Sequence, residues 1–173
     1  GGEEMPNLRV HLIQAQQLNG ADLDGFSDPY CVIKIGSETQ FASQAKSRTI
    51  KHDLNPNWNE YFTLHVNNPN AEMLLVEVKD YDTIGKDDSL GKASLPLHNL
   101  VRGQEKRIWL TLSGGEVGEN LMGNLLGMMT KKKKTNTQVR NKGRIHLGLT
   151  ALDFGGAYGQ QQSYGQQQGY GQQ

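Results

Sequence analysis

"LRVHLIQAQQLNGADLDGFSDPYCVIKI", residues 8–35, holds two apolar segments separated by a loop with three aspartates within seven positions. Apolar and polar residues alternate on both sides of the loop, and a period of two predicts strands. Gly25 and Pro29 interrupt regular structure between them. Like charges at this spacing repel one another, so the loop raises the question of what its carboxylates hold.

The same alternation recurs to residue 152. We expect strands at about residues 7–14, 29–36, 39–49, 60–66, 73–80, 90–96, 106–112 and 143–152. Short strands with polar turns predict an all-β antiparallel sandwich. We expect one domain at residues 5–154, with a long connection at 113–142, and a Gln/Gly/Tyr-rich tail at 155–173 that is disordered by composition.

Composition narrows the function classes. Lys+Arg and Asp+Glu both number 18, so no overall field favours nucleic acid. The single cysteine, Cys31, lies in an apolar strand pattern; we expect it in the core, and its isolation favours a reducing, intracellular compartment. The sequence has no G-x-S-x-G, P-loop or H-E-x-x-H motif, so we expect no enzyme.

A second acidic segment, "VKDYDTIGKDDSLG" at residues 78–91, carries four aspartates. With up-and-down strands, both acidic loops leave the sandwich at the same end. Aspartate is a common turn residue, but that explains poorly two such loops together. Oxygen donors in this number suit Ca²⁺, whereas zinc prefers Cys or His and Mg²⁺ fewer carboxylates. Neither loop has the ligand pattern or helical flanks of an EF-hand.

Together with "KSRTIKHDLNPNWNEYFTL" at residues 46–64, these segments resemble the C2 domain of protein kinase C and synaptotagmins, over residues 7–152. The resemblance implies an eight-stranded antiparallel Greek-key sandwich of type II topology, with both termini away from the calcium loops. It also implies two Ca²⁺ ions and a backbone ligand from Tyr81. The implied carboxylate ligands are Asp22, Asp28, Asp80, Asp82 and Asp88.

Other loop residues are assigned by comparison with that pattern. Asp24 and Asp87 have no ligand counterpart, and we interpret them as charges that set the field or are solvated. Gly85 stands where the family often has a serine or threonine ligand, which argues against a third Ca²⁺. Trp58 is expected to pack beneath the second loop.

The resemblance implies calcium-dependent phospholipid binding, with a cytoplasmic protein recruited peripherally to anionic membranes that contain phosphatidylserine or phosphoinositides. Bound Ca²⁺ changes the charge of the loop end from negative toward neutral. Phe26 and Ile84 either insert into lipid or fold onto the domain. Lys46, Arg48 and Lys51 are either lipid contacts or ordinary solvated residues.

The connection at 113–142 combines an apolar group with a basic run, which is typical of a membrane-surface element. A simple loop with solvated lysines is the alternative. The residues concerned are Leu125, Leu126, Met128, Met129, Lys131, Lys132, Lys133 and Lys134. A competing function is a protein-interaction adaptor whose partner binds the tail. No nucleic acid is expected, because no aromatic residues interleave the lysines.

Overall fold

The computed structural model describes residues 6–19, 25–37, 40–114 and 142–156. These residues form strands, turns and loops, with no helix among them. The strands are β1 (Asn7–Gln16), β2 (Pro29–Gly36), β3 (Phe41–Lys46), β4 (Asn57–His65), β5 (Met73–Asp80), β6 (Asp88–Pro96), β7 (Lys106–Thr111) and β8 (Arg144–Ala151). The predicted all-β class and the strand order are confirmed.

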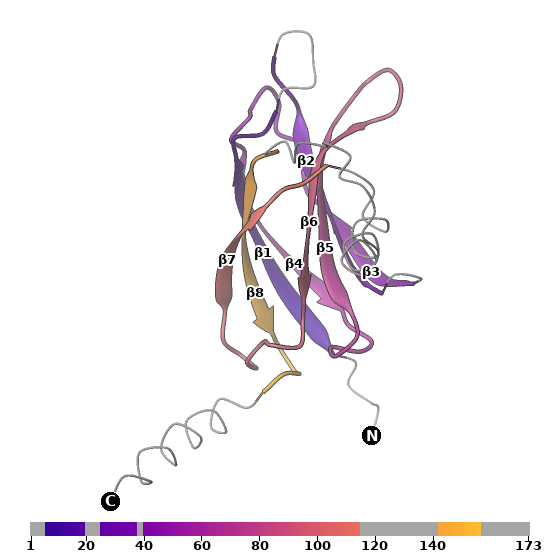
Figure 1. Ribbon diagram of the computed structural model, residues 1–173, viewed down its shortest axis with the longest axis vertical. Helices are drawn as coiled ribbons and strands as arrows, with labels where there is room; N and C mark the ends of the chain where they lie inside the picture. Colours follow the sequence, from indigo (N-terminus) through magenta and orange to yellow (C-terminus); the bar gives the residue numbers. More distant parts are fainter. Residues whose placement is uncertain (1–5, 20–24, 38–39, 115–141, 157–173) are drawn as a thin grey trace, which may run out of the picture.

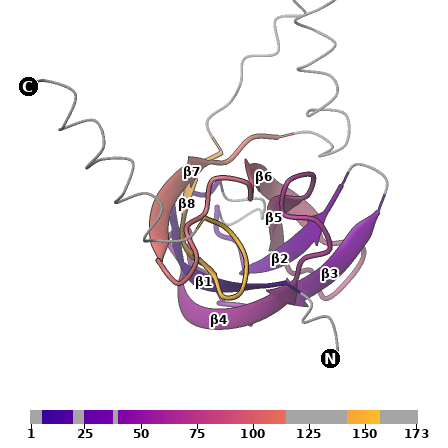
Figure 2. The same ribbon diagram turned by 90° about the horizontal axis from the view of Figure 1, so that it is seen from below.

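The strands make two four-stranded sheets, in the orders β4-β1-β8-β7 and β3-β2-β5-β6. All pairings between these strands are antiparallel. Seen along the strands, the two sheets curve around a shared centre (Figure 2). The protein is therefore a β-sandwich.

The first and last strands are neighbours. Leu8 of β1 lies opposite Ala151 of β8, so the start of β1 and the end of β8 lie at one end of the sandwich (Figure 1). The loop between β5 and β6 lies at the other end (Figure 1). The expected type II topology is confirmed, and the start of β1 and the end of β8 lie away from the acidic β5–β6 loop.

The core is built from the alternating apolar residues of both sheets. In β1, Leu8, Val10 and Leu12 are fully buried, whereas Arg9 between them is exposed. Trp58 of β4 is also fully buried, and its Nε1–H donates to the Arg48 carbonyl oxygen at 3.0 Å. That bond satisfies the polar atom of a large core side chain, and it confirms the packing role expected for this tryptophan.

Two strand limits lie three residues from their predicted positions. The strand expected at 39–49 ends at Lys46, because the chain then turns inward: the Ser47 hydroxyl, rather than a backbone carbonyl, accepts the Cys31 N–H at 2.8 Å. The strand expected from residue 60 begins at Asn57, which pairs with Gln14 beyond an irregularity in β1. Cys31 is fully buried as expected, and burial raises the pKa of its thiol.

Candidate functional site

Three connections meet at the end of the sandwich opposite the start of β1 and the end of β8. They are the β1–β2, β3–β4 and β5–β6 connections, of which residues 17–19, 25–28, 47–56 and 81–87 are described. The Asp53 N–H donates to the Ser27 carbonyl at 3.1 Å, and the Tyr81 N–H donates to the Asp28 carbonyl at 3.0 Å. These bonds hold the three connections together, as strand parity predicts.

Asp28 and Asp80 are in direct contact although they are far apart in sequence. Pro29 pairs with Asp80 across β2 and β5, and the Asp28 N–H donates to Oδ1 of Asp80 at 2.8 Å. The carboxylate of Asp28 accepts the His52 N–H at 2.8 Å. Asp80 is only 3% exposed, so its carboxylate depends on such donors and on any bound cation for compensation.

The β5–β6 connection supplies further carboxylates. Oδ1 of Asp82 accepts the Ile84 N–H at 3.0 Å, and Asp88 lies opposite Asp80 where β5 and β6 begin to pair. Asp87 directly precedes Asp88 in the chain, and its Oδ1 accepts the Asp82 N–H at 2.9 Å. The backbone of this loop is therefore folded around its own carboxylates.

Asp87 also contacts the sheet. Its Oδ2 accepts a hydrogen bond from the Tyr30 hydroxyl. That bond, followed by the Asp82 N–H and the charges of Lys79 and Lys46, lowers the pKa of Asp87 against the opposing effect of burial. Burial and the Asp87 bond raise the pKa of Tyr30. Asp87 is thus bound within the protein, which the sequence did not indicate.

Four of the five expected ligands lie in the described part of the chain; Asp22, like Asp24, lies outside it. Within that part, no three His, Cys, Asp or Glu side chains are grouped so that they could hold a metal ion. The donor chemistry nevertheless fits a hard cation: the carboxylates lie in the acidic loops or at the strand ends that border them, and the Asp28 N–H donates to the Asp80 carboxylate. Asp82 and Asp88 would complete the set, with Asp22 from the first loop.

The two apolar loop residues differ in exposure. Ile84 is 86% exposed, so it does not fold onto the domain. Phe26 is 47% exposed, and its ring centroid lies 6.1 Å from that of His52 in a tilted arrangement. Ile84 is therefore the more available of the two for contact with a lipid surface.

The basic residues named from sequence do not form one cluster. The Lys46 ammonium lies 4.6 Å from the ring centroid of Tyr30, on the outer face of the β3-β2-β5-β6 sheet. Arg48 instead contacts β4, since its Nη2 donates to the Asn57 carbonyl at 3.4 Å. Lys51 is exposed in the turn that follows.

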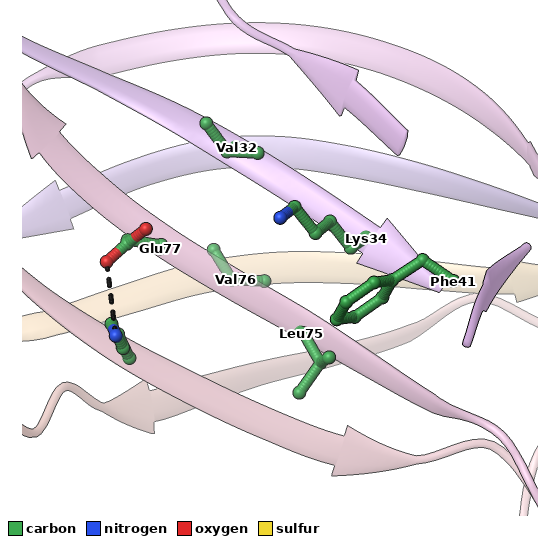
Figure 3. A pocket seen from close by; sticks show the side chains of 7 residues that line it. Val32, Lys34, Phe41, Leu75, Val76 and Glu77 are labelled. Carbon is green, nitrogen blue, oxygen red and sulfur yellow. Dashed lines mark ion pairs between the residues drawn. The ribbon is translucent and has the colours of Figure 1, made fainter. Parts of the chain in front are cut away.

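Other basic residues of that outer face were missed. Lys34 lies over the ring of Phe41, and Lys92 pairs with Glu77 at 3.5 Å. Figure 3 shows Lys34 and Glu77 on neighbouring strands around a shallow hollow of about 150 Å³. A second hollow, of about 340 Å³, lies between Lys34 and Lys46. The period-two position of Lys34 relative to Tyr30 is the signal that could have identified this face.

The long connection between β7 and β8 begins and ends near the acidic loops. Ser113 pairs with Lys92, and the Leu112 N–H donates to the Gly143 carbonyl at 2.8 Å. Gly143 packs closely against the end of β1. A β-carbon at this position would lie only 2.5 Å from the Gln16 carbonyl oxygen. The apolar and lysine residues at 125–134 and the tail beyond Gly156 lie outside the described residues, so the membrane-element and adaptor hypotheses remain predictions.

In the part of the chain that the structure describes, no helix has the length and apolar character needed to cross a membrane.

Comparison with known proteins agrees with the fold. Synaptotagmin-3 of Arabidopsis thaliana is 41% identical over 106 residues, which are 61% of this chain and 19% of that protein. This chain therefore spans about a fifth of that relative's length.

Among solved structures, a C2 domain of plant Extended Synaptotagmin 1 superposes with a TM-score of 0.67 at 24% identity, covering 88% of this chain and 98% of that one. The calcium-bound pair of C2 domains of Extended-Synaptotagmin 2 gives 0.56 at 29% identity, covering 85% of this chain and 45% of that one. The model of the C2 domain family matches residues 6–112. The chain belongs to the C2 domain family.

Proposed function

We propose that this C2 domain is a calcium-dependent module for binding anionic phospholipid membranes. The observation that carries the proposal is the hydrogen bond from the Asp28 backbone N–H to the Asp80 carboxylate, which places these two aspartates side by side at one end of the sandwich. A solved relative at 29% identity is described as calcium bound, and C2 domains are binding modules rather than enzymes. The proposed cation ligands are Asp22, Asp28, Asp80, Asp82 and Asp88, with the Tyr81 carbonyl.

The charge of the loop end explains why a cation is needed. The carboxylates of Asp28, Asp80, Asp82 and Asp88 would repel a phosphatidylserine surface. Bound Ca²⁺, two ions in our proposal, supplies compensating positive charge and open coordination positions for phosphate oxygens. The chain's own contribution is to hold the carboxylates at one edge and to present Ile84 beside them.

Basic residues add attraction for the same surface. Lys46 and Lys34 lie on the outer face of the β3-β2-β5-β6 sheet, and each basic group near an anionic surface contributes about 1 kcal/mol. A phosphoinositide head group is a candidate ligand for this face. The protein would then be peripheral, reaching the membrane when calcium rises.

Vesicle co-sedimentation tests the proposal. The wild-type chain should bind phosphatidylserine vesicles in Ca²⁺ and be released by chelator. Asp82→Asn removes an exposed carboxylate; it should weaken calcium binding by about tenfold or more, because carboxylate number sets Ca²⁺ affinity. Glu105→Gln is the matched control, since it removes one carboxylate beside Arg107 on the other sheet. Equal sedimentation in Ca²⁺ and in chelator would refute the proposal.

Thermal unfolding gives an independent measure without lipid. At a hundredfold excess of free Ca²⁺ over its Kd, the folded state gains about 2.7 kcal/mol, or roughly 8 °C in Tm for a chain of this size. The double variant Asp80→Asn, Asp82→Asn should lose this shift. An unchanged shift in that variant would exclude these loops as the calcium site.

A further inference from the structure

Asp87 has a defined place in the β5–β6 loop. Residues 81–86 are all exposed, whereas Asp87 is partly covered and both of its carboxylate oxygens accept hydrogen bonds. A solvated charge would have no reason to be held at both oxygens. We propose that Tyr30 and Asp87 are positioning residues, which hold the loop in the shape that places Asp82 for cation binding. The inference rests on the proposed function.

The four described ligands are not fixed in the same way. Asp28 and Asp80 lie where β2 and β5 pair, and a hydrogen bond joins them. Asp88 begins β6 opposite Asp80. Asp82 lies beyond the strand ends, so its position depends on the loop itself.

The contacts of Asp82 lead to Asp87. The Asp82 N–H donates to Oδ1 of Asp87, and Oδ1 of Asp82 accepts the Ile84 N–H. The first bond closes the loop across its base, and the second fixes the backbone at the loop tip near Ile84. If Asp87 moves, the backbone and carboxylate of Asp82 move with it.

Tyr30 supplies the fixed end of this arrangement. It lies within β2, pairs with Lys79 of β5, and is only 4% exposed. The Lys46 ammonium covers its ring at 4.6 Å from the centroid. The sheet therefore fixes the position of the Tyr30 hydroxyl. The hydrogen bond from this hydroxyl to Asp87 restricts the movement of a loop that is otherwise exposed. Preorganised ligands bind more tightly because less order is lost on binding.

Tyr30→Phe tests the proposal, because it removes the hydroxyl but keeps the ring and every charge of the loop. Calcium affinity measured by titration calorimetry should fall by about fivefold, the effect of one lost hydrogen bond. The loss should persist in high salt, which screens exposed charges but does not restore a hydrogen bond. Tyr61→Phe is the matched control, since that tyrosine is 59% exposed on β4 and stacks on His11.

A metal-free readout separates this proposal from the proposed function. In chelator, amide hydrogen exchange at Asp82 and Ile84 should accelerate in Tyr30→Phe and stay unchanged in Tyr61→Phe. If the wild type binds no calcium but this acceleration appears, the calcium function fails and the positioning role of Tyr30 stands. If exchange and calcium affinity both match the wild type, the positioning proposal is refuted.

Asp87→Asn gives the second test. It should lower calcium affinity at least as much as Tyr30→Phe, because both the hydrogen bond and the charge are altered. If Asp87→Asn lowers the affinity while Tyr30→Phe leaves it unchanged, Asp87 acts through its charge alone, and the proposal is overturned.

Discussion

Ile84 offers a direct test of how the loop end meets lipid. Ile84→Ala removes the whole side chain beyond Cβ, and each methylene-sized group transferred from water contributes about 0.8 kcal/mol. Because Ile84 is 86% exposed, nearly all of that surface is available for transfer. The expected loss is about 2 kcal/mol, or about thirtyfold in vesicle affinity. Phe26→Ala should cost only about tenfold despite the larger ring, because roughly half of Phe26 is already covered.

The assay is calcium-dependent partitioning into phosphatidylserine vesicles at fixed free Ca²⁺, with calcium affinity measured separately in solution. Folding should be unaffected, since so little of Ile84 contacts the protein. Leu152→Ala is the matched control: Leu152 is 40% exposed, and its N–H bonds to Asn7 at the opposite end of the sandwich. If Ile84→Ala stays within about twofold of the wild type while calcium still binds, the tip does not enter the membrane.

Three further predictions concern stability. Ser47→Ala removes the acceptor of the buried Cys31 N–H and should cost about 1–3 kcal/mol in urea unfolding; no measurable loss would contradict that role. Gly143→Ala should cost about as much, because φ is +94° and a β-carbon would lie 2.5 Å from a carbonyl oxygen of β1, whereas Gly156→Ala, with no contact within 4 Å, should be tolerated. Burial lowers the pKa of His146, so the unfolded chain takes up its proton more readily. The free energy of unfolding should therefore fall as pH drops below about 6.5, and a flat profile that His146→Gln does not change would refute this.

The strands were predictable because alternation directly reports burial in a sandwich. Leu8, Val10 and Leu12 alternate with polar residues, and the structure buries all three. The error at the end of β3 arose where a side chain takes over a backbone hydrogen bond of the ladder. The Ser47 hydroxyl takes the Cys31 N–H, and nothing in the residue types around position 47 distinguishes this serine from one that continues a strand.

The contact between Asp28 and Asp80 was predictable for a related reason. Each aspartate stands where an apolar strand begins or ends, and strand parity brings the two ends together. The bond between Tyr30 and Asp87 was not predictable by the same reasoning. It depends on how far the β5–β6 loop folds back over the sheet, which is decided by hydrogen bonds within the loop and not by a repeating pattern.

Lys46 and Arg48 show the limit of period-two reasoning at a strand end. Two positions apart in one strand, they would share the outer face, and the sequence predicts a common basic surface. The strand ends at Lys46, so Lys46 lies over Tyr30 while the Arg48 side chain contacts the Asn57 carbonyl. Lys34 takes the place that Arg48 was expected to fill, because it lies two positions beyond Val32 in a strand that continues to Gly36. A basic face on this sheet is therefore set by where the strands stop as much as by where the lysines occur.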